Sequence, residues 1–412
     1  MFSTSLLLLT IMISFSTNTF FIFFLDKLST FMILLCILCF TPIKFNFSMA
    51  THKSSFFTSQ LALILFFSIL FFSFITKNMF IFFILFENAL AYLMVLVMVS
   101  GYQPERISAN FYLFNYTLIS SFPFFITITA LMNFFILDWF SSFSTLMTYN
   151  LPNWMLWSCC VMILVKIPIY FFHLWLPKVH VEASTAGSMI LAAIILKLGG
   201  YIMIRLITSW TFLLEFKQML FNLGLLSLII SASLTLFQTD MKSLVAYSSI
   251  FHMSLCLNMA CMAVQTSPLL LVLFISHGLS SNMLFLFSGM FFYSFGTRLM
   301  FYIKNSFSFS FLMSMILLLT LLFNLGIPLS LNFIFEFLAI FTTNQWMSFS
   351  MLIFFPALMI SLMYFLLIST SLIFSPKKNS TNFFMKMNFS MNLTNSLFIF
   401  VSILGYFFFL SI

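Results

Sequence analysis

The sequence predicts a single all-α polytopic membrane protein with about thirteen transmembrane helices. Of its 412 residues, 63% are hydrophobic and only 6% are charged, whereas a water-soluble protein carries about 25% charged residues. Apolar runs of the roughly 20 residues that a spanning helix needs fill almost the whole chain. These runs leave no room for a soluble domain, and no glycine-rich dinucleotide fingerprint or phosphate-binding loop interrupts them.

Short polar breaks separate the predicted helices. The apolar runs between these breaks cover approximately residues 5–25, 28–43, 56–75, 79–100, 108–136, 154–176, 184–208, 211–237, 242–263, 266–294, 308–342, 351–375 and 389–411.

The basic residues of the loops predict which end of the bundle faces inward. Inner loops of a membrane protein carry an excess of lysine and arginine. One alternate set of loops holds Lys44, Lys53, Arg106, Lys178, Lys242, Arg298, Lys304, Lys377, Lys378 and Lys386. The other set holds Lys27, Lys77, Arg205 and Lys217. With an odd number of helices, the N-terminus is predicted on the inner side and the C-terminus on the outer side.

Proline interrupts two of the predicted helices. Pro168 follows Lys166 by two residues, and Pro328 lies in the run at 308–342. Proline deprives the carbonyl four residues earlier of its partner, here Leu164 and Asn324, and kinks or breaks the helix. Interrupted helices in corresponding places of two halves of a transporter mark its ion path.

The spacing of the two prolines predicts the domain organisation. They lie 160 positions apart, which suits two repeats of about five helices within one transmembrane domain. The repeats are expected at about 56–210 and about 211–375, with 1–55 and 376–412 as flanking helices.

Four charged residues lie inside long apolar runs: Glu87, Lys166, Lys197 and Glu336. Glu87 is about ten residues into its helix and hence roughly 15 Å deep, half of the apolar core. A charge at that depth is costly and usually marks a pathway, a relay or a counter-ion. The alternative is that these charges pair and only hold the bundle together.

Histidines add a second set of polar groups. His252 and His277 lie mid-helix on consecutive predicted helices, with serines close by. Imidazole both accepts and donates protons, so the pair either forms a relay or packs as satisfied core histidines. His173 and His180 lie near the ends of apolar runs and are expected to be interfacial.

No metal or redox site is predicted on this chain. Cys36 and Cys39 have CxxC spacing, but within LLCILCF they are read as buried helix thiols.

Three segments carry a resemblance to a known family. GYQPERISANFYLFNYTLISSFP, LVKIPIYFFHLWLPKVHVEASTAGSMILAAIILKLGGY and QTDMKSLVAYSSIFHM resemble the antiporter-like subunit 4 family of mitochondrial NADH:ubiquinone oxidoreductase, respiratory complex I. The resemblance covers roughly residues 26–375. It implies inverted five-helix repeats, each with one broken helix, and a hydrophilic axis running through the membrane plane.

The resemblance also implies roles for the buried polar residues. Glu87 pairs with Lys166 on the broken helix, Lys197 is the central relay, and Glu336 is the terminal donor. His277 matches the histidine of the family's SHG motif, and His252 is added as a second relay candidate.

By the same resemblance, the chain is a core membrane-arm subunit of complex I that translocates protons across the mitochondrial inner membrane. The N-terminus would face the matrix and the C-terminus the intermembrane side. No cofactor is expected on this chain, and NADH, FMN, iron–sulfur clusters and ubiquinone are expected on other subunits. The expected partners are other membrane-arm subunits, including neighbouring antiporter-like ones, the lipid bilayer, protons and internal water, but no nucleic acid.

Two alternatives remain open, and the chain departs from the family pattern in places. It could be an independent monovalent cation/proton antiporter of the same fold, or a non-pumping spacer of the complex. Phe237 stands where relatives carry arginine before QTD, and Phe251 replaces a small residue before His252. Both departures are expected to alter packing or hydration near that histidine.

Overall fold

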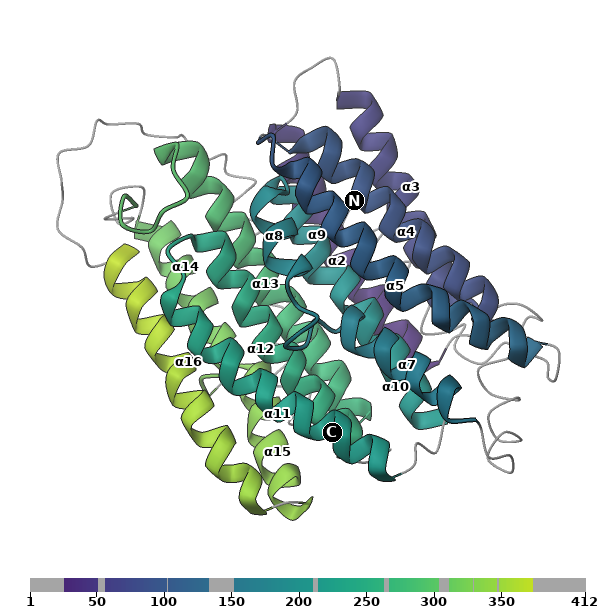
Figure 1. Cartoon of the computed structure of the whole chain (residues 1–412). Coiled ribbons are helices and arrows are strands. Elements are labelled where there is room, and N and C mark those ends of the chain that lie inside the picture. Colours follow the sequence, from purple (N-terminus) through teal and green to yellow (C-terminus); the bar gives the residue numbers. More distant parts are fainter. Residues whose placement is uncertain are drawn as a thin grey trace.

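A computed structural model describes residues 26–50, 56–101, 103–132, 152–209, 214–262, 267–303, 311–328, 330–346 and 348–372. Within these ranges the chain is helical apart from short connections, and the helices lie side by side in one bundle (Figure 1). The helices predicted at 5–25 and 389–411 lie outside the described residues. The all-α prediction is confirmed for the described part of the chain.

The first group of helices runs from purple to teal in Figure 1. It comprises α2 (Lys27–Ala50), α3 (Phe56–Ile75), α4 (Met79–Ser100), α5 (Arg106–Met132), α7 (Asn153–Lys166), α8 (Trp175–Glu182), α9 (Thr185–Ile190), the π-helical turn η1 (Leu191–Ile195) and α10 (Leu196–Ser209). The second group, from teal to yellow, comprises α11 (Leu214–Phe237), α12 (Met241–Met262), α13 (Ser267–Phe295), α14 (Phe311–Asn324), α15 (Leu331–Trp346), the 3₁₀ turn η4 (Ser348–Ser350) and α16 (Met351–Leu372).

Seven described segments are long and apolar enough to cross a membrane by length and composition. They are Met79–Ser100, Arg106–Leu131, Thr185–Ile207, Phe216–Phe237, Met241–Met262, Pro268–Tyr293 and Met351–Ser371. Both interrupted runs fall below the length limit because each is split into two short helices. The predicted run at 154–176 divides into α7 and α8, and the run at 308–342 into α14 and α15.

Three of the seven spans form the interior of the bundle. The α9–η1–α10 segment, α12 and α13 are each 94% buried over their most apolar window, whereas α16 is 28% buried. The interior spans also carry the polar residues, since a polar side chain facing lipid has no partner and one facing another helix can find one. Lys197, His252 and His277 lie on these three interior segments.

The first break is held by a side chain from the helix that follows it. The Leu164 carbonyl, which Pro168 cannot satisfy, accepts instead from the Ile169 amide at 3.3 Å. The next carbonyl, of Val165, accepts from the Trp175 indole N–H at 3.2 Å. The exposed carbonyls at the end of α7 thus gain partners across the break. Phe171 completes the turn with a positive φ of 81°.

The second break repeats the backbone pattern of the first. The bonds Ile167→Ile163, Ile169→Leu164 and Phe172→Ile169 recur as Leu325→Leu321, Ile327→Leu322 and Ser330→Ile327. Each pair in the second break lies 158 positions after its counterpart, as Leu325 does after Ile167. A side chain again satisfies a helix-end carbonyl, because the Asn332 amide donates to the Phe323 carbonyl at 2.9 Å.

This offset of 158 positions differs from the 160 positions between Pro168 and Pro328. It matches Lys166 with Asn324, the last residues of α7 and α14, and Pro168 with Gly326 rather than with Pro328. We match the residues of the two breaks by their hydrogen bonds, because these bonds define the backbone path of each turn. Proline can stand at more than one position of a turn and is a weaker guide.

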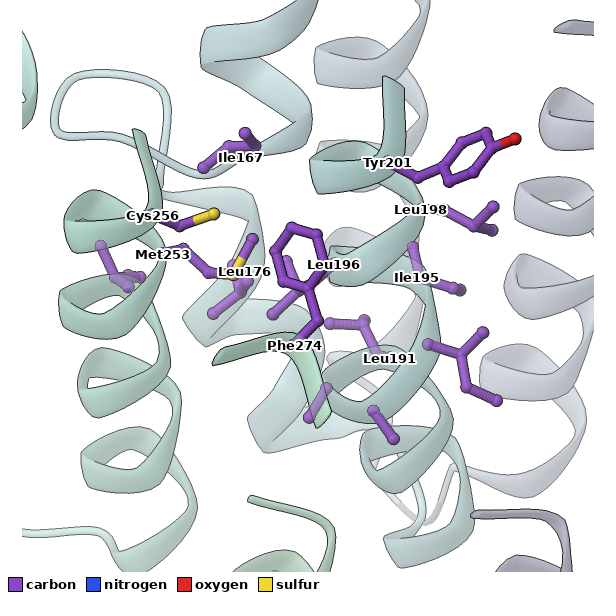
Figure 2. Close-up of a cluster of buried hydrophobic side chains, with 14 of the residues drawn as sticks. Ile167, Leu176, Leu191, Ile195, Leu196, Leu198, Tyr201, Met253, Cys256 and Phe274 are labelled. Carbon is purple, nitrogen blue, oxygen red and sulfur yellow. The ribbon is translucent and has the colours of Figure 1, made fainter. Parts of the chain in front are cut away.

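α13 lies along the seam between the two groups and contacts α2, α9 and η1 as well as α12, α14 and α15. Glycine permits the closest approaches. At Gly200 the ring of Phe274 lies where a Cβ would be, with its Cζ at 2.3 Å, and a Cβ on Gly289 would be 2.1 Å from the Thr185 methyl. Apolar side chains from the first break, α8, η1–α10, α12 and α13 fill the space around this contact (Figure 2).

Several of the predicted inner loops meet at one end of the bundle. Backbone bonds join Met241 to Arg298 and Met300 to Thr239, and the Arg298 guanidinium donates to the Gln103 side chain at 3.1 Å. At the predicted outer end, Arg205 pairs with Asp26. These contacts agree with the grouping of loops that the basic residues predict.

Candidate functional site

The first predicted pair forms beside the first break. The Lys166 ammonium lies 3.2 Å from Glu87 Oε1, with the lysine side chain 4% exposed and the glutamate side chain 28% exposed. Lys166 is the last residue of α7, where the free carbonyls of the helix end favour a cation. Its ammonium also lies 4.5 Å from the centre of the Phe86 ring. The break thus places a cation where a carboxylate, a helix end and an aromatic face all stabilise it.

Lys197 is held in a different environment. Its side chain is fully buried, and its ammonium donates to the Ala192 carbonyl at 2.6 Å and contacts His277 Nδ1 at 2.8 Å. Among the described residues, no carboxylate lies within ion-pair distance of it. The π-helical turn η1 immediately precedes α10, and such turns are frequent at functional sites.

The two histidines continue from Lys197 towards α15. The rings of His277 and His252 lie 5.0 Å apart between centroids. His252 Nδ1 in turn lies 3.8 Å from Glu336 Oε1. Both histidines and Glu336 are buried. Residues from α10, α12, α13 and α15 therefore form one connected row.

The backbone of α10 links this row to the Lys166 pair. A Cβ on Gly199 would lie 3.0 Å from the Lys166 carbonyl oxygen and 3.2 Å from its Cβ. α10 therefore crosses α7 at the residue that ends it, two positions after Lys197. The structure buries five of the six predicted residues, and Glu87, which pairs with Lys166, is partly exposed.

A polar network around Glu336 was not predicted from the sequence. Ser280 donates to the Asn324 side-chain carbonyl at 3.1 Å, and the Asn324 amide donates to the Tyr364 hydroxyl at 3.0 Å. Asn332 accepts a bond from Ser276. The available signal was Asn324 itself, a polar residue between an apolar run and the GIP turn.

Gly326 makes room for the Glu336 carboxyl group. It has a φ of +70°, and a Cβ there would lie 2.4 Å from Glu336 Oε2. The turn of the second break therefore packs directly on the acid, as the end of α7 packs on α10 in the first.

Three expectations about the surrounding residues are wrong. His173 and His180 are buried, at 5% and 0% exposure, rather than interfacial. Lys242, assigned to a loop, is 5% exposed and donates to the Ala183 carbonyl at 2.7 Å. His173 packs on the rings of Tyr170 and Tyr247, and His180 stacks on the ring of Phe285. The length of the apolar run does not reveal these contacts.

The two aromatic departures have different outcomes. Phe237 is 78% exposed at the end of α11, and its effect near His252 stays a prediction. Phe251 is buried, and its ring meets the His252 ring edge-on at 5.3 Å. The Phe251 side chain therefore packs directly against the histidine.

Within the described residues, no group of three or more histidine, cysteine, aspartate or glutamate side chains is arranged to hold a metal ion. The six cysteines lie buried as free thiols. The lysine, histidine and glutamate side chains of the row are groups that can bind and release protons.

Comparison with known proteins identifies the family of the chain. A model of the transmembrane region of NADH:quinone oxidoreductases and Mrp antiporters matches residues 76–363. The chain belongs to this family.

Within the family, the chain is a homologue of chain 4 of NADH-ubiquinone oxidoreductase. It is 35% identical to that chain of Rhipicephalus sanguineus over 345 residues, which cover 82% of this chain and 76% of the relative. The chain 4 protein of Artemia franciscana is 35% identical over 278 residues, covering 66% and 68%.

Solved structures share the fold of this family member. A chain of respiratory complex I from Thermus thermophilus aligns with a TM-score of 0.80 at 20% identity, covering 93% of this chain and 82% of that one. A chain of an archaeal membrane-bound sulfane sulfur reductase aligns with a TM-score of 0.83 at 16% identity, covering 94% of this chain and 81% of that one. The chain therefore has the antiporter-like fold of multi-pass membrane proteins.

Proposed function

We propose that this homologue of chain 4 is a proton-translocating membrane subunit of NADH:ubiquinone oxidoreductase, driven by electron transfer on other subunits. Glu87, Lys166, Lys197, His277, His252 and Glu336 form its proton path. NADH, FMN, iron–sulfur clusters and ubiquinone are held elsewhere in the complex, and this chain supplies the ionisable row in the membrane.

The observation that carries the proposal is the environment of Lys197. A structural charge in a membrane is neutralised by a partner of opposite sign. The ammonium of Lys197 instead contacts a carbonyl and an imidazole nitrogen, and neutral imidazole can accept a proton from it. Lys197 is thus placed to give up its proton along the row to His277.

The two ends of the row suit a directional transfer. At one end the Glu87–Lys166 pair holds a proton on Lys166, and loosening of the pair leaves the buried ammonium uncompensated, so that its proton moves on towards Lys197. At the other end Glu336 receives protons through His252. Moving one charge costs about 2.3 kcal/mol per 100 mV of membrane potential. Two unit charges 4 Å apart interact with about 4 kcal/mol at an effective dielectric constant of about 20, which is of the same order.

Glu87 is also the place at which a neighbouring subunit would influence the proton path. Its side chain is 28% exposed, seven times the exposure of Lys166 at 4%. A charge on a neighbouring membrane subunit would therefore reach the carboxylate more readily than the ammonium. Neighbouring antiporter-like subunits are the partners we propose for this surface.

The proposed membrane setting follows from the same observations. The matched hydrogen bonds of the two breaks support inverted five-helix repeats at about 56–210 and 211–375 within a set of about thirteen helices. We place the chain in the mitochondrial inner membrane, with the lysine- and arginine-rich end and the N-terminus on the matrix side and the C-terminus on the intermembrane side.

The test is Lys166→Ala in the assembled complex, reconstituted in liposomes. The number of protons translocated per NADH oxidised is expected to fall, because the pair that starts the transfer is gone. The control is Lys178→Ala, which removes an exposed lysine that lies over the Tyr112 ring at 3.5 Å and should leave the ratio unchanged.

Unchanged proton-to-electron stoichiometry in Lys166→Ala would contradict the proposal and favour a non-pumping spacer. Sodium-dependent proton flux by the isolated chain, without NADH, would favour an independent antiporter.

A further inference from the structure

The outer end of the bundle, opposite the lysine- and arginine-rich end, holds a mostly buried ion pair that the proposed path does not use. Asp26 precedes α2 and pairs with Arg205 near the end of α10, with the two side chains 16% and 12% exposed. Arg205 also donates to the Tyr201 hydroxyl at 3.0 Å, and its guanidinium carbon lies 5.0 Å from the centre of the Tyr201 ring. The guanidinium is therefore held by a carboxylate and by a tyrosine of its own helix.

The residue spacing of α10 connects this ion pair to Lys197. Lys197, Tyr201 and Arg205 are four residues apart, so they follow one another along one side of the helix. Two steps of four residues place Arg205 roughly 12 Å from Lys197 along the helix axis. Tyr201 is the only polar side chain of α10 between them. A proton that moved along this side of α10 between Lys197 and the outer end would pass both Tyr201 and Arg205.

Aromatic rings from three helices pack together beside this part of α10. The Tyr201 ring lies 5.4 Å from the ring of Phe74 on α3 and 5.6 Å from that of Phe82 on α4, between centroids. Phe82 stacks in turn on Phe86, at 6.2 Å with planes inclined by 9°. None of the four residues is more than 2% exposed. We call these four rings, of Phe74, Phe82, Phe86 and Tyr201, the aromatic layer.

The aromatic layer reaches both lysines of the proposed path. Phe86 at one edge lies 4.5 Å from the Lys166 ammonium, and Tyr201 at the other edge is one turn outward of Lys197. The α3 ring and one α4 ring come from the last turn of α3 and the first turn of α4, next to the outer end. Apolar constrictions in channels close by excluding water. The layer is therefore a barrier between the outer end and the lysines.

The fixed charge of Arg205 adds a second barrier. A guanidinium stays protonated in proteins and has no acceptor, so it does not pass a proton on. Its positive charge repels an excess proton, as an arginine does in pores that exclude protons and cations. Asp26 and Tyr201 hold this charge at the outer side of the aromatic layer.

We propose that Arg205 and the aromatic layer seal the outer end of the bundle against the return of protons to Lys197. This seal rests on the proposed function, because only a chain that moves protons against a membrane potential has to prevent their return. The potential pulls protons from the outer side back into the interior. A return through Lys197 would dissipate the gradient that the complex builds.

The test measures passive proton flux through the assembled complex in liposomes, without NADH, while a potassium gradient and valinomycin impose a membrane potential of either sign. Arg205→Gln removes the charge but keeps a polar side chain, and it is expected to raise the proton flux several-fold. Asp26→Asn breaks the ion pair but keeps the guanidinium, and it should leave the flux at the parent level. If the pair only fastened α2 to α10, the two variants would change the flux alike, and that result would overturn the seal.

Two further variants define where the protons pass. Arg205→Gln combined with Lys197→Ala should return to the parent flux, because the leak is expected to run through Lys197. Arg298→Gln is the matched control, since Arg298 is 12% exposed, as Arg205 is, and pairs with Glu182 at the opposite end. It should keep the parent flux.

Parent flux in Arg205→Gln would overturn the seal, and so would equal increases in Arg205→Gln and Arg298→Gln. An increase that persists without Lys197 would overturn the proposed route of the leak. All three results would leave the proposed function intact, which the proton-to-electron ratio of Lys166→Ala tests separately. If Arg205→Gln does not assemble, Phe82→Ala replaces it, since it opens the aromatic layer and should raise the flux. Parent flux in Phe82→Ala would likewise overturn the seal.

Discussion

At the scale of single residues, the position of Glu336 depends on a glycine in the opposing turn. The carboxyl group of Glu336 occupies the space beside Gly326 that any side chain would fill. A side chain at position 326 would therefore displace this carboxyl group, which lies 3.8 Å from His252. The same turn adopts a positive φ, which glycine tolerates best.

Gly326→Ala is expected to displace the Glu336 carboxyl group and to lower proton translocation per NADH oxidised. The matched control is Gly296→Ala, because Gly296 also has a φ of +70° but has no atom within 4 Å of the position that a Cβ would take. Both variants bear the roughly 1–2 kcal/mol cost of a left-handed alanine, and only Gly326→Ala crowds the acid. Equal translocation in the two variants would show that the crowding has no consequence.

At the scale of elements, the two breaks are held by similar side-chain hydrogen bonds, and the accepting carbonyls occupy corresponding positions of the two breaks. A side chain from the first turn of each following helix donates to a carbonyl at the end of the preceding one: Trp175 to Val165 and Asn332 to Phe323. A helix end buried in a membrane interior has no water to satisfy its carbonyls. These bonds therefore stabilise the break and with it the position of Lys166.

Trp175→Phe tests this role. It keeps an aromatic ring in the buried site but leaves the Val165 carbonyl without its donor, at an expected cost of about 1–3 kcal/mol. The midpoint of thermal unfolding of the subunit in the complex should fall. Trp157→Phe is the control, since Trp157 is 49% exposed and makes an edge contact with Phe216 that phenylalanine can keep. An equal change in the two variants would contradict the role of the indole N–H.

The contact between α10 and α13 is a second element-scale feature, since it brings His277 to Lys197. Gly200→Ala would place a Cβ against the Phe274 ring and is expected to destabilise the subunit by about 1–3 kcal/mol, the cost of overpacking. Phe274→Leu in the same chain should recover part of this loss, because the shorter side chain vacates the contact. Additive effects of the two changes in thermal unfolding would mean that they do not interact.

At the scale of the whole molecule, buried helices hold ionisable side chains away from lipid. The three segments that are 94% buried, α9–η1–α10, α12 and α13, carry Lys197, His252 and His277. Four connections meet at the basic end through Gln103, Ala183, Met241 and Arg298. This end carries the orientation signal.

The orientation can be measured with single cysteines, because all six native cysteines are buried. Pro104 at the basic end and Asn153 at the start of α7 are both exposed. With a membrane-impermeant thiol reagent, Pro104→Cys should react from the matrix side and Asn153→Cys from the intermembrane side. Labelling of both from one side would contradict the predicted topology.

The spans, the breaks and the buried charges were predictable because each depends on a short stretch of chain. An apolar run of a given length spans a bilayer wherever it occurs, and a proline or a charge inside it is costly in any neighbourhood. Glu87, Lys166, Lys197 and Glu336 were identified on this ground, and the helix bounds agree with the apolar runs to within a few residues in most of the described helices.

Only the tertiary structure decided which of these groups meet. In a membrane both the lipid-facing and the helix-facing sides of a span are apolar, so the pattern of a single helix does not reveal its inner face. The 158-residue register of the breaks, the burial of His180 and Lys242, and the contact of Lys197 with His277 all arise from packing between segments far apart in the chain. The amino-acid sequence by itself determined how deep each charge lies, and packing determined what lies beside it.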